Sequence, residues 1–241
     1  GYVGHMSAKM MKRAKVVEAR QQKEIEQKSE LLKNAEVDSS LKIAPLIYRS
    51  ERLAAFNAVT PFYGGKGVCA PVTFNIIRGQ RIALEGANGS GKSSLLKILC
   101  GQSIEYSGQV ITGSGLIISY VPQSFSHLRG KLSDFAAQNK TDESLFKAVL
   151  HKMGVDKGQF DKDIAEFSDG QKKKVLIAKS LCDKAHLYVW DEPLNFIDIY
   201  SRIQIEKLLC EFKPSMIFVE HDQAFTKNIA TATVKLTPPL N

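Results

Sequence analysis

Apolar and polar positions follow two rhythms along the chain from about residue 50 to the C-terminus. Short runs rich in apolar and β-branched residues predict strands at 54–59, 72–77, 81–85, 109–115, 116–121, 187–190 and 216–219. Between these runs, apolar residues at helical spacing predict helices at 94–99, 132–153, 171–182 and 201–212. Buried strands that alternate with helices favour an α/β fold with a mainly parallel sheet flanked by helices.

Residues 6–37 follow a different pattern, rich in Lys, Glu, Gln, Ala and Met. Apolar positions such as Met10, Val17, Ile25 and Leu32 recur every seven or eight residues, a stripe wide enough for one partner helix but too thin for a core. We expect one long exposed helix here, about 45 Å long if it spans ~30 residues. The alternative is a frayed terminal arm without a partner.

A phosphate-binding pattern follows the predicted strand at 81–85. Residues 86–93 read Gly-Ala-Asn-Gly-Ser-Gly-Lys-Ser and match G-x-x-x-x-G-K-[ST] at every fixed position. In a strand–loop–helix unit, successive backbone N–H groups ring a phosphate and the positive end of the helix faces it. We therefore predict that Lys92 reaches the terminal phosphates of a nucleotide and that the Ser93 hydroxyl binds Mg²⁺. The alternative is a turn that happens to hold three glycines.

Two acids, Asp191 and Glu192, end the apolar strand that begins at Leu187. Ligands of open α/β sheets bind at the carboxyl ends of the strands, so these side chains are placed to meet one. We expect Asp191 to hold Mg²⁺ through water and Glu192 to polarise the water that attacks a γ-phosphate. The alternative is a strand capped by solvated acids.

The segment 167–171 reads Phe-Ser-Asp-Gly-Gln and opens the next predicted helix, with Ser168 as its N-cap. A serine and a glycine at a helix N-terminus favour an anion site. Lys172, Lys173 and Lys174 in the first turn oppose the helix dipole, a placement that a nearby phosphate would explain. Taken alone, this segment is only a capped helix.

Composition narrows the class of protein. The chain has 241 residues, 44% of them hydrophobic, and a formal net charge of +8, which favours polyanionic partners but equally fits a solvated basic surface. No run approaches the roughly 18 apolar residues of a membrane span. The four cysteines are scattered without a C-x-x-C pair, which favours reduced thiols in a cytosolic protein over a disulfide or zinc framework.

Six segments in this order resemble the motifs of the ATP-binding cassette (ABC) ATPases over about residues 50–236. They are the phosphate loop and residues 121–123, 167–171, 191–193, 194–198 and 219–222. The resemblance implies a P-loop NTPase fold of the ABC type: a mostly parallel core sheet, an antiparallel β subdomain and a small helical subdomain at about 124–170. It also implies a globular domain at 41–241.

The resemblance also implies a role for each matching residue. ATP would be held by Tyr63, stacked on adenine, and by Gly86, Asn88, Gly89, Ser90, Gly91, Lys92, Ser93 and Ser94. Mg²⁺ would be held by Ser93, Gln123 and Asp191. Glu192 would be the catalytic glutamate, His221 the switch histidine on the γ-phosphate, and Lys92 the third catalytic group. Asp198 would end the D-loop, the segment 194–198.

The segment 167–171 matches the signature motif, in which Ser168, Gly170 and Gln171 touch the γ-phosphate bound on a partner cassette. A complete site therefore needs a second cassette, either in a longer chain or in a homodimer with ATP. The usual signature has two adjacent glycines, and Asp169 replaces the first; its carboxylate would repel a triphosphate unless it points away or pairs with a lysine. Phe196 replaces a histidine common in the D-loop of one soluble branch.

Residues 190–198 and 170–179 resemble the F subfamily of ABC proteins, particularly its antibiotic-resistance branch that protects the ribosome. That branch implies a fragment: residues 1–40 as half of a helical interdomain linker, followed by the second cassette. It further implies a cytoplasmic ATPase that binds the ribosome and its rRNA when ATP closes the cassettes. The alternatives are the ATP-binding subunit of a membrane transporter for drug efflux and a coiled-coil ATPase of DNA maintenance.

Overall fold

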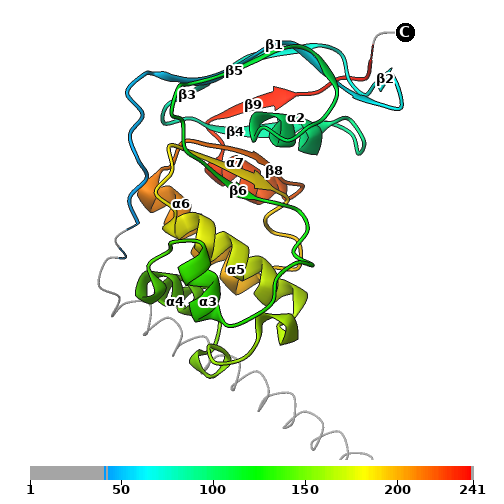
Figure 1. The fold of residues 1–241 in the computed structure, drawn as a ribbon. Helices are drawn as coiled ribbons and strands as arrows, with labels where there is room; N and C mark the ends of the chain where they lie inside the picture. Colours follow the sequence, from blue (N-terminus) through cyan, green and yellow to red (C-terminus); the bar gives the residue numbers. More distant parts are fainter. Residues whose placement is uncertain (1–40, 42, 240–241) are drawn as a thin grey trace, which may run out of the picture. The chain divides into compact units, whose positions relative to one another are not determined.

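The computed structural model describes residue 41 and residues 43–239, and the linker helix expected at 1–40 lies outside these residues. A parallel sheet of five strands forms the centre of the domain, in the order β6-β7-β8-β4-β9 (Figure 1). Its strands are β4 (Arg81–Glu85), β6 (Ile118–Val121), β7 (Leu187–Asp191), β8 (Met216–Val219) and β9 (Ala232–Lys235). Every residue of β7 and β8 is buried, which is why these segments are uniformly apolar up to Asp191.

A second, antiparallel sheet is built around the long strand β1. It contains β1 (Arg52–Tyr63), β2 (Lys66–Gly67), β3 (Val72–Ile77) and β5 (Tyr106–Thr112), and β1 pairs with the other three. The Phe56 and Phe74 rings stack across β1 and β3 with centroids 4.5 Å apart. The predicted mixture of parallel and antiparallel strands is thus present.

Several strand boundaries differ from the prediction. The first strand extends to Tyr63 instead of ending at Val59. Proline has no N–H to donate, but the Pro61 carbonyl accepts a hydrogen bond from the Val68 amide, and this keeps the strand in the sheet. The predicted strands at 109–115 and 116–121 are in fact β5, ending at Thr112, and β6, starting at Ile118. The chain turns at 113–116, where the Leu116 amide donates to the Gly113 carbonyl.

The predicted helix at 132–153 is wrong as a single element. It consists of α3 (Leu132–Gln138) and α4 (Glu143–Lys152). Lys140 between them has a left-handed backbone with φ of 54°, and the Asp142 side chain accepts from the Leu145 amide as the N-cap of α4. A capping aspartate inside an apolar pattern therefore divides the helix. Two short 3₁₀ turns follow, η1 (Lys157–Gln159) and η2 (Ile164–Glu166).

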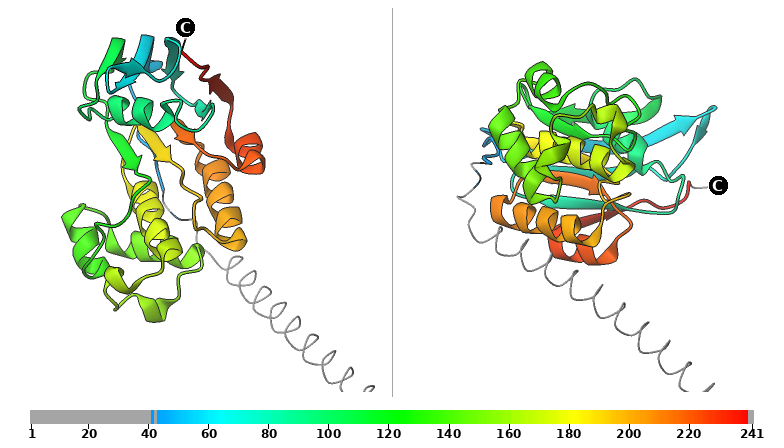
Figure 2. Two further views of the ribbon diagram at one scale, coloured as in Figure 1. Left: turned by 90° about the vertical axis from the view of Figure 1, so that its right-hand side faces the viewer. Right: turned by 90° about the horizontal axis from the view of Figure 1, so that it is seen from below.

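Four further helices complete the described domain. They are α2 (Lys92–Leu99), α5 (Asp169–Cys182), α6 (Ile199–Phe212) and α7 (Gln223–Ile229). The predicted N-cap of α5 is confirmed: Ser168 Oγ accepts from the Gln171 amide, and the Gln171 side chain accepts from the Ser168 amide. Figure 2 shows α2 near the antiparallel strands and α5, α6 and α7 farther from them.

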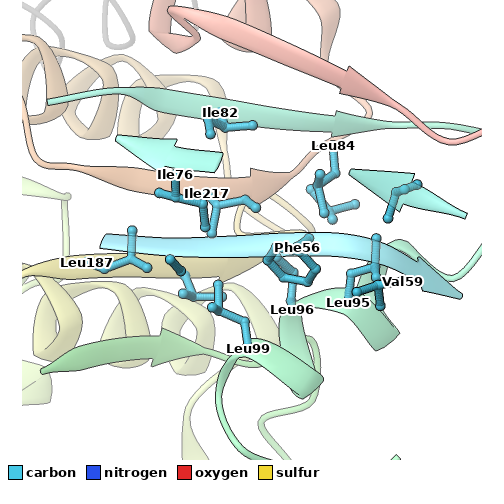
Figure 3. Packing of buried hydrophobic residues seen from close by; sticks show 14 of the residues in the cluster. Phe56, Val59, Ile76, Ile82, Leu84, Leu95, Leu96, Leu99, Leu187 and Ile217 are labelled. Atoms are coloured by element: carbon cyan, nitrogen blue, oxygen red, sulfur yellow. The ribbon is translucent and has the colours of Figure 1, made fainter. Parts of the chain in front are cut away.

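The main hydrophobic core lies between the two sheets and α2. Phe56 and Val59 of β1 meet Leu95, Leu96 and Leu99 of α2 there, as Figure 3 shows. Buried residues of β3, β4, β7 and β8 complete the same core. This packing fixes α2 and the loop before it relative to the carboxyl ends of β4 and β7, where the predicted site residues lie.

Candidate functional site

The predicted phosphate loop connects β4 to α2 in a tightly packed turn. Gly91 has a left-handed backbone with φ of 86°, and a Cβ at this position would lie 2.6 Å from Val68 Cγ2. A Cβ at Gly86 would lie 2.6 Å from Ser90 Oγ. No side chain caps the N-terminus of α2, so its first N–H groups are left for an anion.

Lys92, the first residue of α2, is buried and points its ammonium back into this loop. Its Nζ donates to the carbonyl oxygens of Gly86 at 2.8 Å and Ala87 at 2.9 Å. The ammonium is therefore held over the turn in which a phosphate would sit, and neutral carbonyls are weaker partners for it than a phosphate would be.

Ser93 and Asp191 meet below the loop, where the Ser93 hydroxyl donates to Asp191 Oδ1 at 2.9 Å. Asp191 is fully buried, and its second oxygen, Oδ2, has no hydrogen-bond partner among the described residues. Burial raises the pKa of this carboxyl, and the hydrogen bond from Ser93 opposes that rise. An unpartnered buried carboxylate oxygen beside a hydroxyl fits Mg²⁺, which commonly takes one or two protein oxygens and completes its shell with water and phosphate.

Glu192 lies at the centre of a group of polar side chains. Its Oε2 accepts from Gln123 Nε2 at 2.9 Å and from Asn195 Nδ2 at 2.6 Å, and its Oε1 lies 3.2 Å from His221 Nε2. The backbone of Glu192 is left-handed, with φ of 48°, a strained conformation that is common at functional sites. The structure thus brings Gln123, Glu192 and His221 together, three residues predicted separately from distant motifs.

Glu220, beside His221, ties two loops of this site together. Its Oε2 accepts from the Leu194 amide at 3.0 Å, and its Oε1 accepts from the His221 amide at 2.8 Å. Neither Glu220 nor Asn195 was among the predicted site residues. Asn195 comes three residues after Glu192 in the sequence, and side chains at this spacing can meet within one turn. This spacing was the signal that could have predicted their contact.

A cavity of about 730 Å³ opens between the phosphate loop and the Glu192 group. Its lining includes most of the predicted ATP-binding residues, together with Gln123, Glu192, His221 and the unpredicted Val68. Tyr63 lies at its edge with 55% of its surface exposed, and its hydroxyl lies 2.8 Å from Ser94 Oγ. The volume is in the range of small-molecule sites, and the open tyrosine ring can stack on an aromatic base.

The signature residues do not take part in this cavity. Ser168, Gly170 and Gln171 are absent from its lining, and the side chains of Ser168 and Gln171 are bonded to each other's backbone as the cap of α5. A Cβ on Gly170 would lie 2.5 Å from the Phe196 carbonyl oxygen. Asp169 is exposed in the first turn of α5, where the helix dipole favours a carboxylate.

Two of the three lysines near the start of α5 have partners within the protein. Their position therefore does not require the nearby phosphate that the sequence suggested. Lys174 is buried and pairs with Asp198 Oδ2 at 2.8 Å. Burial alone would raise the pKa of Asp198, but hydrogen bonds from Lys174 and Ser201 lower it to about 2. Lys173 is fully buried, and desolvation lowers its pKa to about 8.

The chain is similar to known proteins in both sequence and structure. The family model described as ABC transporter matches residues 69–195. The ATP-binding protein Uup of Caulobacter vibrioides is 30% identical over 77% of this chain and 32% of its own length. The probable ATP-binding protein YheS of Escherichia coli K12 is 28% identical over 88% of this chain and 35% of its own length.

A plant relative, ABC transporter F family member 2 of Arabidopsis thaliana, is 29% identical over 67% of this chain and 25% of its own length. The chain thus spans about a third, or less, of the length of these relatives. Among solved structures, a bacterial Atm1-family ABC exporter with ATP bound has a TM-score of 0.68 at 16% identity, over 83% of this chain and 40% of that one. This likeness confirms the predicted fold class.

Proposed function

Because the chain belongs to the ABC transporter family, we propose that its cavity binds ATP with Mg²⁺ and that a second cassette completes the site for hydrolysis. One observation carries the proposal. The cavity is lined by the phosphate loop, Glu192 and His221, and Asp191 is buried directly behind Ser93 of that lining, while the signature residues lie outside it. Since all these motifs are present in one chain, the signature serves a nucleotide held by another cassette.

In the proposed reaction, the loop amides of residues 88–93 and the Lys92 ammonium hold the triphosphate. Ser93, Gln123 and Asp191 would hold Mg²⁺, which would neutralise charge that develops on the transferred phosphoryl group. Glu192 accepts a proton from the attacking water, because its carboxylate is oriented by Gln123, Asn195 and His221. Tyr63 stacks on the adenine, and Ser168, Gly170 and Gln171 contact the γ-phosphate of the partner's nucleotide.

We further propose that this cassette acts on the ribosome in the cytoplasm and gives antibiotic resistance by protecting it. The support is the resemblance of residues 190–198 to the F subfamily of ABC proteins. A relative named ABC transporter F family member 2 adds to it. The competing function is the energising of a membrane transporter. Within the described residues, no helix is both long and apolar enough to cross a bilayer.

Hydrolysis tests the first part of the proposal. Glu192→Gln should bind ATP as tightly as the wild type but lower kcat by about 100-fold or more, because the amide cannot accept the proton of water. Fluorescent-ATP titration and phosphate release measure the two effects. Glu211→Gln, an exposed change on α6, is the matched control and should hydrolyse at the wild-type rate. Full activity of Glu192→Gln would contradict the assigned role.

The cellular role is tested with the complete gene. Glu192→Gln, trapped with ATP, should sediment with ribosomes in a sucrose gradient, and expression of the wild type should raise the drug concentration that cells tolerate. Sedimentation with membranes would support the transporter instead. If the protein binds ribosomes but drug tolerance does not change, the resistance role is rejected and a role as a translation factor is supported instead.

A further inference from the structure

Lys173 of α5 is fully buried, although lysine is normally among the least buried residues. Its ammonium donates to three main-chain carbonyl oxygens. They belong to Pro122 at 2.9 Å, Gln123 at 3.3 Å and Asp191 at 3.4 Å. One side chain therefore joins two loops that are far apart in the sequence.

These carbonyls lie where the ladder between β6 and β7 ends. The last paired residues of the two strands are Val121 and Trp190. Pro122 follows, and because proline has no N–H it cannot donate a further hydrogen bond to β7. The Lys173 ammonium stands just beyond this last pair and supplies donors to the carbonyls of both strand ends.

The two residues next to this junction meet in the candidate site. Gln123 follows Pro122, Glu192 follows Asp191, and Gln123 Nε2 donates to Glu192 Oε2 at 2.9 Å. Lys173 thus anchors the backbone on both sides of the Gln123–Glu192 hydrogen bond. An error of about 1 Å in such an arrangement costs up to roughly 100-fold in rate, so the anchor bears on catalysis.

Stability alone does not call for an ammonium at this position. Burying a charged group is costly, and well-packed apolar residues of similar volume often serve stability equally well. Methionine has a similar length and would fill the same space. The ammonium differs from methionine in its three donors, which are the feature that acts on the two loops.

We propose that Lys173 is a positioning residue that holds the Gln123 loop against the end of β7 and so orients the Glu192 carboxylate to accept a proton from the attacking water. The catalytic part rests on the proposed ATP hydrolysis, since Lys173 itself touches neither nucleotide nor water in this role. It acts through the hydrogen bond between Gln123 and Glu192.

The test compares Lys173→Met, which removes the donors, with Lys173→Arg, which keeps a cationic donor group. In the 241-residue chain at a concentration that allows two copies to pair, Lys173→Met should lower kcat about tenfold or more with KM for ATP nearly unchanged. Arginine should recover most of the rate. The matched control is Lys179→Met on the same helix, whose lysine pairs with Asp183 away from the cavity and whose loss should leave kcat unchanged.

A double-mutant cycle separates positioning from a general effect on the fold. Because Lys173 acts through Gln123, adding Lys173→Met to Gln123→Ala should cause no further loss of kcat. Independent, additive losses would overturn the proposal, as would a Lys173→Met rate within about twofold of the wild type. Failure of both Met and Arg variants to fold would assign Lys173 a purely structural role, which also overturns it.

Crystal structures without nucleotide test the anchor separately from hydrolysis. In Lys173→Met, Gln123 Nε2 should move beyond about 3.5 Å from Glu192 Oε2, while Lys92 keeps its contacts with the phosphate loop. An unchanged Gln123–Glu192 contact would reject the anchor. A wild-type chain without ATPase activity would instead reject the proposed function and, with it, the catalytic part of the role of Lys173.

Discussion

At the scale of single residues, two features define the site: a buried oxygen without a hydrogen-bond partner, and a glycine with no room for a side chain. Asp191 has a buried oxygen, Oδ2, without a hydrogen-bond partner among the described residues, which is where a cation fits. Gly170 has no room for a Cβ beside the Phe196 carbonyl, whereas the neighbouring Asp169 is exposed. The steric demand on the signature therefore falls on its second glycine, and this explains how an aspartate is accommodated at the first.

Asp198 provides a prediction of pH dependence at this scale. Its pKa is lowered to about 2 in the folded protein, below the value of about 3.9 in an unfolded chain. The charge of Asp198 therefore stabilises the fold above about pH 4, and this contribution is lost as the pH falls through about 2. In Asp198→Asn, which keeps an N-cap side chain, the contribution is absent at every pH.

Urea unfolding of the wild type and Asp198→Asn between pH 7 and pH 2.5 measures the contribution of the Asp198 charge to stability. The difference in free energy of unfolding between the two proteins should be constant above about pH 4 and shrink below it. A difference that stays constant down to the lowest pH would show that Lys174 and Ser201 do not hold the carboxylate in its charged form.

At the scale of elements, the carboxyl ends of parallel strands collect the chemistry. β4 leads into the phosphate loop, β7 into Asp191 and Glu192, and β8 into the loop that carries His221. Since β4, β8 and β7 are neighbours in the parallel sheet, their ends lie at one edge. Residues about a hundred positions apart in the sequence are thereby brought within hydrogen-bonding distance.

Two helix caps of the same kind allow a test of the signature. Ser168 caps α5 and Asp142 caps α4, each through a side-chain oxygen that accepts from a backbone amide. Replacing either by alanine should lower the free energy of unfolding by about 1 kcal/mol. Only Ser168→Ala should also reduce ATP hydrolysis, because only this hydroxyl would contact a nucleotide.

Chemical denaturation and phosphate release, measured on the two variants in parallel, give the answer. Equal loss of stability with hydrolysis reduced in Ser168→Ala alone supports the trans contact. If both variants hydrolyse ATP at the same rate, Ser168 is only a helix cap.

At the scale of the whole molecule, the proposed site takes its signature half from a second copy. Mixing two inactive variants of the chain tests this, provided that copies pair head to tail. Lys92→Ala spoils the phosphate loop, and Ser168→Ala spoils the signature. In the mixed pair, one site combines the intact loop of one chain with the intact signature of the other, so an equal mixture should recover about a quarter of the wild-type rate.

The control is a mixture of Lys92→Ala with Glu192→Gln. Both changes affect the half of the site within one chain, so no combination restores an intact site and hydrolysis should stay at background. Recovery in this control, or its absence in the first mixture, would contradict the head-to-tail arrangement.

Much of the site was predicted from the sequence because its motifs are local. The phosphate loop needs glycines at fixed positions for its turn. Asp191 and Glu192 are recognised because two acids directly follow an apolar segment. The family and the fold class inferred from these motifs are confirmed. The roles of the individual residues remain predictions until nucleotide binding and hydrolysis are measured.

Errors arose where one local signal outweighed another and where a strand's extent depended on distant partners. The periodicity at 132–153 did not reveal the break at Lys140, because capping by Asp142 outweighs the continuity of the apolar stripe. The full extent of β1 depends on the partners β3 and β5 on its two sides, which no local signal specifies.

The amino-acid sequence by itself determined the phosphate loop, the identity of the acids and most of the core strands, since each depends on neighbours a few residues away, whereas β2, α7 and β9 were not predicted. Only the tertiary structure decided that Glu192 gathers Gln123, Asn195 and His221, that Lys173 is buried against three carbonyls, and that the signature stands outside the cavity. The physical reason is that burial and hydrogen-bond partners are properties of packed strands and helices. They are fixed when the β6–β7 junction, α5 and the phosphate loop come together in the fold.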